Sequence, residues 1–467
     1  MEKNDFREFF NRTSSSREKW RKKNRFYHKL LEKYFTFIIP PEKKVIEIGC
    51  GTGDLLNALK PAYGLGIDFS PGIIEQARIK YPALHFSVTD AENLQVNETF
   101  DYVILSDLVG SLWDIQGALK NIHRICHPGT RVVISSYNFL WEPLMILGER
   151  LHIKLRQPRQ NWLSVSDLNN LLYLEGFQVI TCQKKILFPK YIPLLNGFIN
   201  RFLANLPLIN ALGLINLVVA RTASETERDY TVTIVIPARN EMGNIENAVS
   251  RIPYFGSSQE IIFVEGHSTD MTWEEIQRVS KMYPGKNIKI MQQSGKGKGN
   301  AVREGFAAAS GEVLMILDAD LTMPPEELPK YYQALKEGLG EFINGCRLVY
   351  PIEKQAMRAL NFIANKFFGL FFSYLLGQHL KDTLCGTKVL FARDYLTIQQ
   401  NRHYFGDFDP FGDFDLLFGA ARLNLKITEI IVRYRERTYG SSQISRFRHG
   451  WLLVRMSLFA ARKIKFI

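Results

Sequence analysis

Cysteine is scarce in this chain of 467 residues, and the five cysteines lie far apart. They include no Cys-x-x-Cys pair, so the sequence favours neither a disulfide framework nor a zinc site and fits a reducing cytosol. The N-terminus mixes acidic and basic residues from Glu2 onward and has no apolar core of signal-peptide length. We therefore expect a cytoplasmic protein.

Long hydrophobic runs are also missing. A membrane-spanning helix needs roughly 18 to 20 uninterrupted apolar residues, and the nearest candidates, Ile209 to Ala220 and Phe367 to Gly377, are shorter. The composition is nevertheless 46% hydrophobic, and 467 residues exceed what a single core usually organises. The sequence therefore predicts two packed α/β domains without a spanning helix.

Positive charge is abundant and unevenly distributed. The net charge is +12, with basic runs from Arg17 to Lys33 and from Arg433 to the C-terminus. These runs are explained either by a solvated surface or by attraction to anionic lipid head groups or a phosphate-bearing substrate. No recognised nucleic-acid-binding motif accompanies them, so we do not expect nucleic acid as a partner.

Short β-rich segments alternate with helical stretches in the first half of the chain, which is typical of a doubly wound parallel sheet. The predicted strands are residues 44–48, 64–67, 84–87, 101–105 and 131–135. We expect a basic helical extension at 1–40, a first domain at 41–222, a polar linker at 223–229 and a second α/β domain at 230–467. No internal repeat is visible, so the two domains are different modules.

A glycine-rich turn follows the first predicted strand, with the spacing Glu47-x-Gly49-x-Gly51-x-Gly53. Such a turn lets backbone N–H groups approach a ligand closely. The spacing differs from the G-x-G-x-x-G of nicotinamide dinucleotide folds, which favours a donor without a pyrophosphate. Asp68 ends the next predicted strand, where a carboxylate can accept both ribose hydroxyls, and Asp90 follows the third, placed to receive an adenine amino group.

Together with Phe100-Asp101-Tyr102-Val103, these motifs resemble the class I S-adenosylmethionine-dependent methyltransferases. The resemblance implies a Rossmann-like domain that binds S-adenosylmethionine through Glu47, Gly49, Cys50, Gly51, Gly53, Asp68, Phe69, Asp90, Ala91 and Ser106. Methyl transfer displaces an already activated sulfonium, so a strong base is optional. Ser106 and Asp107 either face the methyl group or cap the strand end. A degenerate fold used only for docking is the alternative for the whole domain.

Polar residues also follow the strands predicted in the second domain. The run Pro237-Ala238-Arg239-Asn240-Glu241 closes one strand, Glu265 ends the next, and Lys298 lies in a glycine-spaced basic loop that does not match a P-loop. Asp318-Ala319-Asp320 then puts two carboxylates at one strand end. Hard oxygens of this kind can hold Mg²⁺ or Mn²⁺ against a diphosphate.

From about Tyr230 the chain resembles family 2 glycosyltransferases of the GT-A fold, particularly the polyprenyl-phosphate mannosyl- and glucosyltransferase type. The late run Arg437-Thr438-Tyr439-Gly440-Ser441-Ser442 belongs to the match, whereas Glu265-Gly266 replaces a commoner Asp-Asp pair and Gln443 a frequent Lys. The resemblance implies a nucleotide-sugar site, for a UDP- or GDP-linked donor, made by Pro237, Ala238, Arg239, Glu241, Glu265, Lys298, Asp318, Ala319 and Asp320, with Asp318 and Asp320 as metal ligands.

The implied chemistry is inverting glycosyl transfer to a lipid phosphate or a saccharide. Asp413 and Asp415 are the candidate bases, and the resemblance favours Asp415 slightly. A phosphate acceptor needs no base, and Arg347 or Arg437 would then hold its charge. The alternative for each of these residues is a surface ion pair.

Three segments are rich in apolar and aromatic residues interrupted by basic or polar ones: residues 357–375, 451–465 and 186–220. The first two are either interfacial helices that place the protein at the inner face of the cell membrane or buried core helices. The third is either another surface-lying element or a pad between the domains.

Taken together, the residues predict a bifunctional methyl- and glycosyltransferase of glycan or glycolipid assembly. A glycosyltransferase with a docking or regulatory first domain is one alternative. A non-catalytic membrane scaffold is the other.

Overall fold

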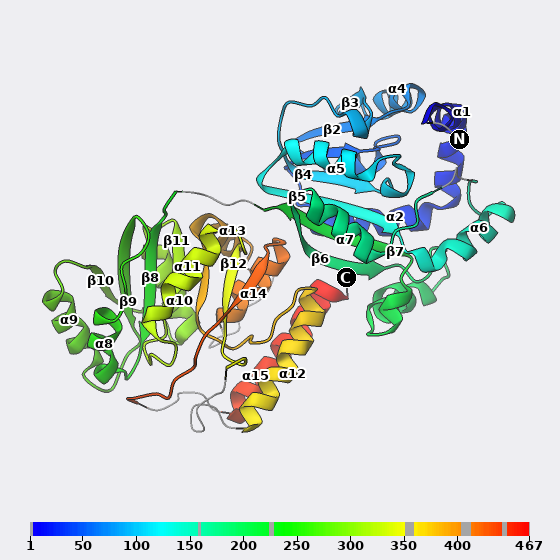
Figure 1. Ribbon diagram of the computed structural model, residues 1–467. Helices are drawn as coiled ribbons and strands as arrows, with labels where there is room; N and C mark the ends of the chain where they lie inside the picture. The colour runs from blue at the N-terminus through cyan, green and yellow to red at the C-terminus, as the bar shows by residue number, and fades with distance from the viewer. Residues whose placement is uncertain are drawn as a thin grey trace. The chain divides into compact units, whose positions relative to one another are not determined.

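The computed structural model describes residues 3–156, 160–223, 228–350, 359–402, 412–440 and 446–466. The chain divides into two compact units, residues 1–223 and 224–465. Each contains a seven-stranded sheet, so the predicted two-domain α/β architecture is confirmed (Figure 1).

The first unit has the strand order β3-β2-β1-β4-β5-β7-β6. Every strand pair is parallel except those of β7, which runs antiparallel to β5 and β6. Its elements are α1 (Lys3–Lys23), α2 (Arg25–Ile38), β1 (Lys44–Ile48), α3 (Asp54–Ala58), β2 (Tyr63–Asp68), α4 (Pro71–Lys80), β3 (His85–Val88), β4 (Phe100–Ser106), α5 (Ile115–Arg124), β5 (Cys126–Tyr137), α6 (Glu142–Arg150), α7 (Val165–Leu174), β6 (Phe177–Lys185) and β7 (Ile215–Thr222).

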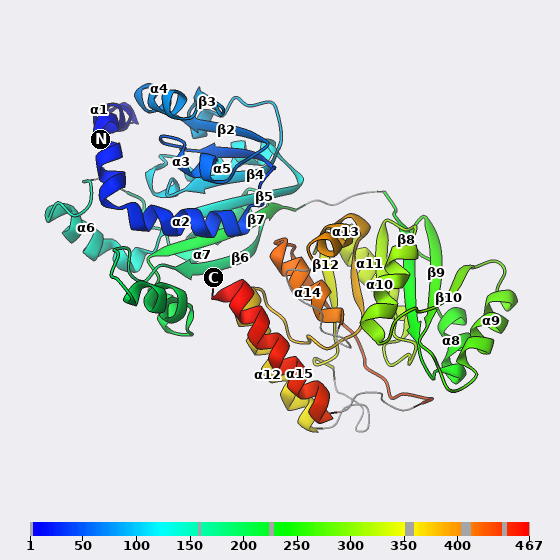
Figure 2. The same cartoon turned by 180° about the vertical axis from the view of Figure 1, so that it is seen from behind.

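Helices cover both faces of this sheet, with α5 and α7 in contact on one side and α2 and α3 on the other (Figures 1 and 2). Burial on both faces explains why its central strands are almost continuously apolar. The sheet is doubly wound, because the chain leaves β1 toward β2 and later returns to β4 on its other side. The loops after β1 and β4 therefore diverge, and a ligand crevice is expected between them.

β5 begins earlier than predicted, at Cys126 instead of Arg131. The extension pairs Cys126 with Phe100 of β4, and the register then shifts before Arg131 pairs with Tyr102. A bulge of this kind tolerates the Pro-Gly pair at 128–129.

The second unit has the strand order β10-β9-β8-β11-β13-β12-β14, with β13 antiparallel to both of its neighbours. Its elements are β8 (Thr231–Ala238), α8 (Ile245–Ser250), β9 (Ser258–Glu265), α9 (Thr272–Met282), β10 (Asn287–Gln292), α10 (Lys298–Ala308), β11 (Val313–Ile316), α11 (Leu328–Lys336), β12 (Phe342–Cys346), α12 (Ala359–Leu376), β13 (Lys388–Phe391), α13 (Ala392–Gln400), α14 (Gly412–Arg422), β14 (Ile427–Ile431) and α15 (Arg446–Ala460).

One core cluster joins the strands of this sheet to α8, α9 and α11. Another helix, α10, packs on β8 and β9, and Gly305 makes this possible because a Cβ there would overlap Val235. The helices α12 and α15 lie side by side in both views (Figures 1 and 2). Within the described ranges, the longest apolar helices fall short of what crossing a bilayer requires.

Candidate active sites

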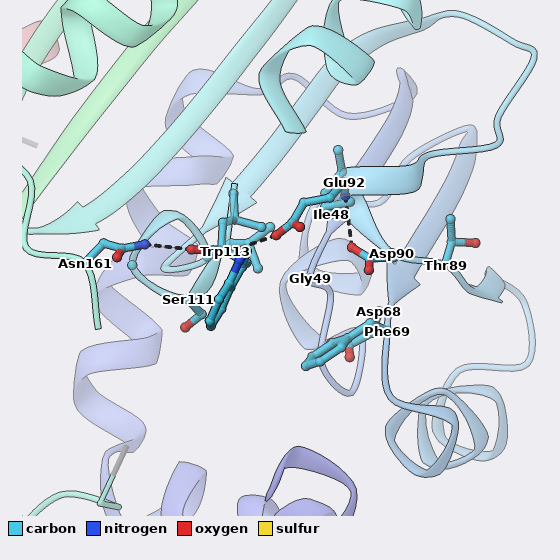
Figure 3. A pocket seen from close by; sticks show the side chains of 14 residues that line it. Ile48, Gly49, Asp68, Phe69, Thr89, Asp90, Glu92, Ser111, Trp113 and Asn161 are labelled. Carbon is cyan, nitrogen blue, oxygen red and sulfur yellow. Dashed lines mark hydrogen bonds between the residues drawn. The ribbon is translucent and has the colours of Figure 1, made fainter. Parts of the chain in front are cut away.

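A cavity of about 470 Å³ opens in the first unit beyond the ends of β1, β2 and β4 (Figure 3). This is the crevice expected at the reversal of strand order. Five of the residues predicted to bind the cofactor line it, namely Gly49, Asp68, Phe69, Asp90 and Ala91. The structure thus gathers residues from the ends of three successive strands, β1, β2 and β3.

The glycine loop after β1 has a backbone that other residues rarely adopt. Gly49, Gly51 and Gly53 have φ of 73°, 54° and 78°. A Cβ on Gly49 would come 2.7 Å from Leu108, and one on Gly53 would come 2.6 Å from Phe86. Glycine is therefore required both by conformation and by close packing.

The Asp68 carboxylate is held rigidly at the cavity wall. Its two oxygens accept the backbone N–H groups of Gly51 at 3.2 Å and Ser70 at 3.0 Å. Asp90 similarly accepts the N–H of Glu92 at 3.0 Å and caps a short 3₁₀ turn. Backbone donors therefore help to fix the position of both carboxylates.

Other predicted cofactor residues lie away from the cavity lining. Glu47 is buried beneath the loop, where it accepts the N–H of Leu56 at 3.1 Å. Burial raises the pKa of Glu47 to about 8. Ser106 faces the Ser135 hydroxyl at 3.5 Å, and Cys50, Gly51 and Gly53 shape the loop. The structure therefore places Glu47 as a support of the loop.

The cavity also contains residues that the sequence did not suggest. Glu92 accepts the N–H groups of Trp113 at 2.7 Å and Asp114 at 3.1 Å, and the Asn161 amide donates to the Leu112 carbonyl at 2.7 Å (Figure 3). The sequence feature that could have identified Glu92 as a cavity residue is its position two residues after Asp90. Trp113 and Asn161 lie on loops, and no local sequence pattern predicts that these loops line the cavity.

The N-terminal extension packs on the cofactor side of the first unit. The Phe10 ring lies 5.5 Å from that of Phe69, edge to face. Asp54 at the start of α3 pairs with Arg21 at 3.3 Å and with Lys80 at 2.8 Å. Part of the basic N-terminal run is therefore used in internal ion pairs.

In the second unit, Lys298 at the start of α10 pairs with Asp318 after β11 at 2.6 Å. The positive charges of Lys298, Lys388 and Arg347 outweigh burial and hold the pKa of Asp318 below its usual value. Gly386 lies directly against this pair, because a Cβ there would overlap both the Asp318 carboxylate and the Lys298 ammonium.

Arg437 joins two of the predicted donor-site acids. Its guanidinium nitrogens lie 2.7 Å from Glu241 and 2.7 Å from Asp320. Burial nevertheless raises the pKa of Glu241 to about 7, against the opposing effect of Arg437. Asp320 also accepts the hydroxyl of Thr322 at 2.8 Å.

The remaining strand-end residues frame this site. Glu265 is buried and accepts the N–H of Ser268 at 2.6 Å and the amide of Gln292 at 3.3 Å. Ala238 and Ala319 are buried, and Pro237 and Arg239 flank Ala238 at the end of β8. A predicted set that is scattered over 80 residues of sequence thus meets at the carboxyl ends of β8, β9 and β11.

The predicted catalytic residues are divided among different surroundings. Arg347 forms a two-pronged ion pair with the fully buried Asp382, at 2.7 and 2.9 Å. Asp415 faces Arg303 at 3.8 Å and Arg402 at 3.5 Å. The side chain of Asp413 and residues 441–443 lie outside the described residues. Arg437, in contrast, contacts Asp320, one of the two predicted metal ligands.

A doubly wound unit with a glycine loop and a unit with paired strand-end aspartates define the chain as a two-domain group-transfer enzyme. Residues 18–182 match the family model of a methyltransferase domain. Residues 233–397 match that of glycosyl transferase family 2. The chain therefore carries a methyltransferase domain followed by a family 2 glycosyltransferase domain.

Similar proteins are known for both parts. The dolichol-phosphate mannosyltransferase of Pyrococcus furiosus is 43% identical over 109 residues, which are 23% of this chain and 30% of that protein. The undecaprenyl-phosphate 4-deoxy-4-formamido-L-arabinose transferase of Yersinia enterocolitica is 27% identical over 228 residues, 48% of this chain and 65% of that protein. The chain thus spans less than two thirds of each. A solved S-adenosylmethionine-dependent methyltransferase of Thermotoga maritima is 20% identical, with a TM-score of 0.36, over 45% of this chain and 97% of its own.

Proposed function

We propose that the protein is a bifunctional transferase that works in glycan or glycolipid assembly. The first domain transfers a methyl group from S-adenosylmethionine, and the second transfers a sugar from a nucleotide donor with inversion. The observation that carries the proposal is the pairing of both predicted metal-binding aspartates with a cation, Lys298 on Asp318 and Arg437 on Asp320. We take residues 41–222 and 230–467 as the domain limits, supported by the division of the chain at residue 224.

For the methyl donor, the cavity of the first unit supplies two carboxylates, those of Asp68 and Asp90. Asp68 would accept the ribose hydroxyls and Asp90 the adenine amino group, while the loop from Gly49 to Gly53 would approach the methionine part. Methyl transfer then depends mainly on alignment of donor and acceptor.

For the sugar donor, the residues present fit a divalent metal ion. Magnesium in nucleotide sites is usually bound by one or two carboxylates together with substrate phosphates. Asp318 and Asp320 would supply the carboxylates. In keeping with this mode, the described residues contain no cluster of three His, Cys, Asp or Glu side chains able to bind a metal alone. When bound, the metal would offset charge on the leaving diphosphate.

The two cations would change partners when the donor binds. Lys298 and Arg437 lie on the aspartates that would face the metal, so phosphate oxygens can replace carboxylates as their acceptors. Each cation would pair with a carboxylate before the donor binds and with phosphate oxygens afterwards, when the carboxylates would face the metal.

A lipid phosphate is the acceptor that we favour, since relatives are named for dolichol phosphate and undecaprenyl phosphate. A phosphate nucleophile needs no base, which agrees with the pairing of Asp415 to two arginines. Asp415 is the base that we would assign if the acceptor were a saccharide.

Peripheral membrane contact is part of the proposal. On α12, Ile363, Phe367 and Leu370 recur at helical spacing and are exposed, as are Trp451, Val454 and Leu458 on α15. In the first unit Leu194 and Leu208 are 99% and 90% exposed, both with positive φ. Apolar side chains of this kind beside basic residues suit an anionic lipid surface.

Calorimetry of the full-length protein tests both donor sites, because a ligand that binds the folded state shows as heat and as added stability. We expect S-adenosylmethionine to bind the parent and to bind Asp68→Ala more weakly, by about 1.5–3 kcal/mol. We expect one UDP- or GDP-sugar to bind with Mn²⁺ to the parent but not to Asp318→Asn. Asp167→Asn, an exposed helix-cap substitution on α7, is the matched control. A nucleotide-sugar response without any S-adenosylmethionine binding would leave a glycosyltransferase with a docking or regulatory first domain.

A further inference from the structure

A second, narrow recess adjoins the donor cavity of the first unit. It measures about 10 Å³, and Gly110 and Asn161 line both spaces. A volume of about one probe sphere admits a single oxygen-sized atom. Its other lining residues are Asp107, Ser136, Tyr137, Gln160, Trp162 and Leu163. The recess therefore marks a point beside the donor cavity where one polar atom of a second substrate could enter.

Asp107 is held at this point from two elements. One carboxylate oxygen accepts the Tyr27 hydroxyl of α2 at 2.6 Å, and the other accepts the Ser135 hydroxyl of β5 at 2.8 Å. Its backbone N–H donates to the Ser135 carbonyl at 3.0 Å, and its φ is +54°. Residues with such backbone angles that are held by several bonds cluster at functional sites, which makes Asp107 a candidate for a functional role.

Aromatic and amide groups surround the carboxylate. Tyr137 stacks on Tyr27 with ring centroids 6.3 Å apart, and the Trp162 ring lies 6.3 Å from that of Tyr137. Asn161 and Gln160 add amides to the lining. Ring faces can cover the C–H surface of a sugar while amides pair with its hydroxyls.

We propose that Asp107 is the general base of the methyltransferase domain and that this recess receives a saccharide hydroxyl. The proposal rests on the methyl transfer proposed above. The acceptor O–H gives its proton to the Asp107 carboxylate as its oxygen bonds to the methyl carbon. The bond between that carbon and sulfur breaks, and the electron pair stays on sulfur, so the sulfonium becomes a neutral thioether.

Tyr27 and Ser135 are positioning residues in this scheme. Burial raises the pKa of Asp107 above its usual value, while its bonds to the two hydroxyls oppose the rise. A base is thereby brought closer to working pH. Of the charged groups nearby, Lys154 lies over the Tyr137 ring at 5.6 Å and pairs with Glu149 at 2.8 Å. An uncharged amine acceptor would attack without a base and would make Asp107 dispensable.

The test uses full-length protein, S-adenosylmethionine and a panel of methyl hexopyranosides, UDP- and GDP-sugars and simple primary amines, with S-adenosylhomocysteine and methylated product measured. Asp107→Asn keeps the shape of the residue, and Asn tolerates positive φ. We expect it to lose about 10²-fold or more in turnover, the typical contribution of a general base. The affinity of Asp107→Asn for S-adenosylmethionine should stay within about twofold of the parent. Both the turnover and the affinity of the control Asp167→Asn should stay within the same limit.

Tyr27→Phe tests whether the Tyr27 hydroxyl positions and tunes Asp107 or only supports the fold. It removes a bond that lowers the pKa of Asp107, so the acid limb of the pH–rate profile should move to higher pH. Parental turnover in Asp107→Asn, transfer to amines only, or no transfer to any sugar by protein that binds S-adenosylmethionine would overturn the assignment. Failure of the parent to bind S-adenosylmethionine would instead remove the proposed methyl transfer itself.

Discussion

Replacement of Glu47 by Gln should stabilise the first unit increasingly as pH rises. The Glu47 carboxyl is buried under the glycine loop, and burial raises its pKa from 4.5 to about 8. Between these values the unfolded chain has released the proton and the folded chain still holds it. The folded state therefore binds more protons, so its stability must fall as pH increases through this window. Glutamine keeps the acceptor for the Leu56 N–H and does not titrate.

The size of the effect follows from the width of the window. Each pH unit between the two pKa values changes the free energy of unfolding by about 1.4 kcal/mol. From pH 5 to pH 8 this sets an upper bound of about 4 kcal/mol of stability that the parent loses and Glu47→Gln keeps. For a unit of this size, 1 kcal/mol shifts Tm by about 2–4 °C. A relative shift of several degrees is therefore expected.

Differential scanning calorimetry at pH 5 and pH 8 measures the shift, and hydrogen exchange of peptides spanning β1 and α3 assigns it to the loop. Variant and parent are compared at the same pH, so the intrinsic dependence of exchange on pH cancels. Glu75→Gln on the exposed side of α4 is the control and should track the parent. A Tm difference between Glu47→Gln and the parent that is equal at both pH values would refute a proton on Glu47.

Three further substitutions test the donor sites. Gly386→Ala should reduce glycosyl transfer by about 10²-fold, because the new Cβ displaces Asp318 and Lys298; nucleotide release at the parental rate would contradict this. Asp68→Ala should weaken S-adenosylmethionine binding by about 1.5–3 kcal/mol, the usual value of hydrogen bonds to a charged group, and unchanged calorimetric affinity would count against the cavity as donor site. Arg437→Lys should lower turnover about 10-fold, since an ammonium cannot span two carboxylates as a guanidinium does; equal initial rates would show that the bridge is dispensable.

Much of the fold could be predicted, because most strands of both sheets are parallel and the central ones are buried on two faces. Such strands appear in the sequence as short apolar runs, and each run in the first domain coincides with an observed strand. The start of β5 was missed because Pro128 and Gly129 look like a turn. Their effect is overridden by pairing with β4 across a register shift, which is a tertiary contact.

The signal for the candidate sites was strongest where an acidic residue ends or follows a strand, as Asp68, Asp318 and Asp320 do. Arg347 also follows a strand, β12, but its partner Asp382 is 35 residues away, so the buried pair that engages it could not be foreseen. Likewise, the basic N-terminal run suggested a solvated or lipid-facing surface, whereas Arg21 pairs with Asp54 and Tyr27 reaches Asp107. These contacts depend on how the extension packs, which no local pattern specifies.

The two domains reach different chemistry from the same local arrangement of strands. In each sheet the first four strands stand in the order third, second, first, fourth, and all are parallel. Acids that follow the second and fourth strands must then flank the loop after the first. Asp68 and Asp107 do so in one unit, and Glu265 and Asp318 in the other.

The difference lies in the loop after the first strand. In the first unit it contains three glycines at positive φ, Gly49, Gly51 and Gly53, and their spacing differs from that of loops that bind a dinucleotide pyrophosphate. In the second unit it presents Glu241, which is tied to Asp320 through Arg437. Charge at that loop is already balanced by an exchangeable cation, as a site for a diphosphate and its metal requires. Exchange of these two loops, and not of the strand-end acids, would therefore be expected to exchange the class of donor that each sheet can bind.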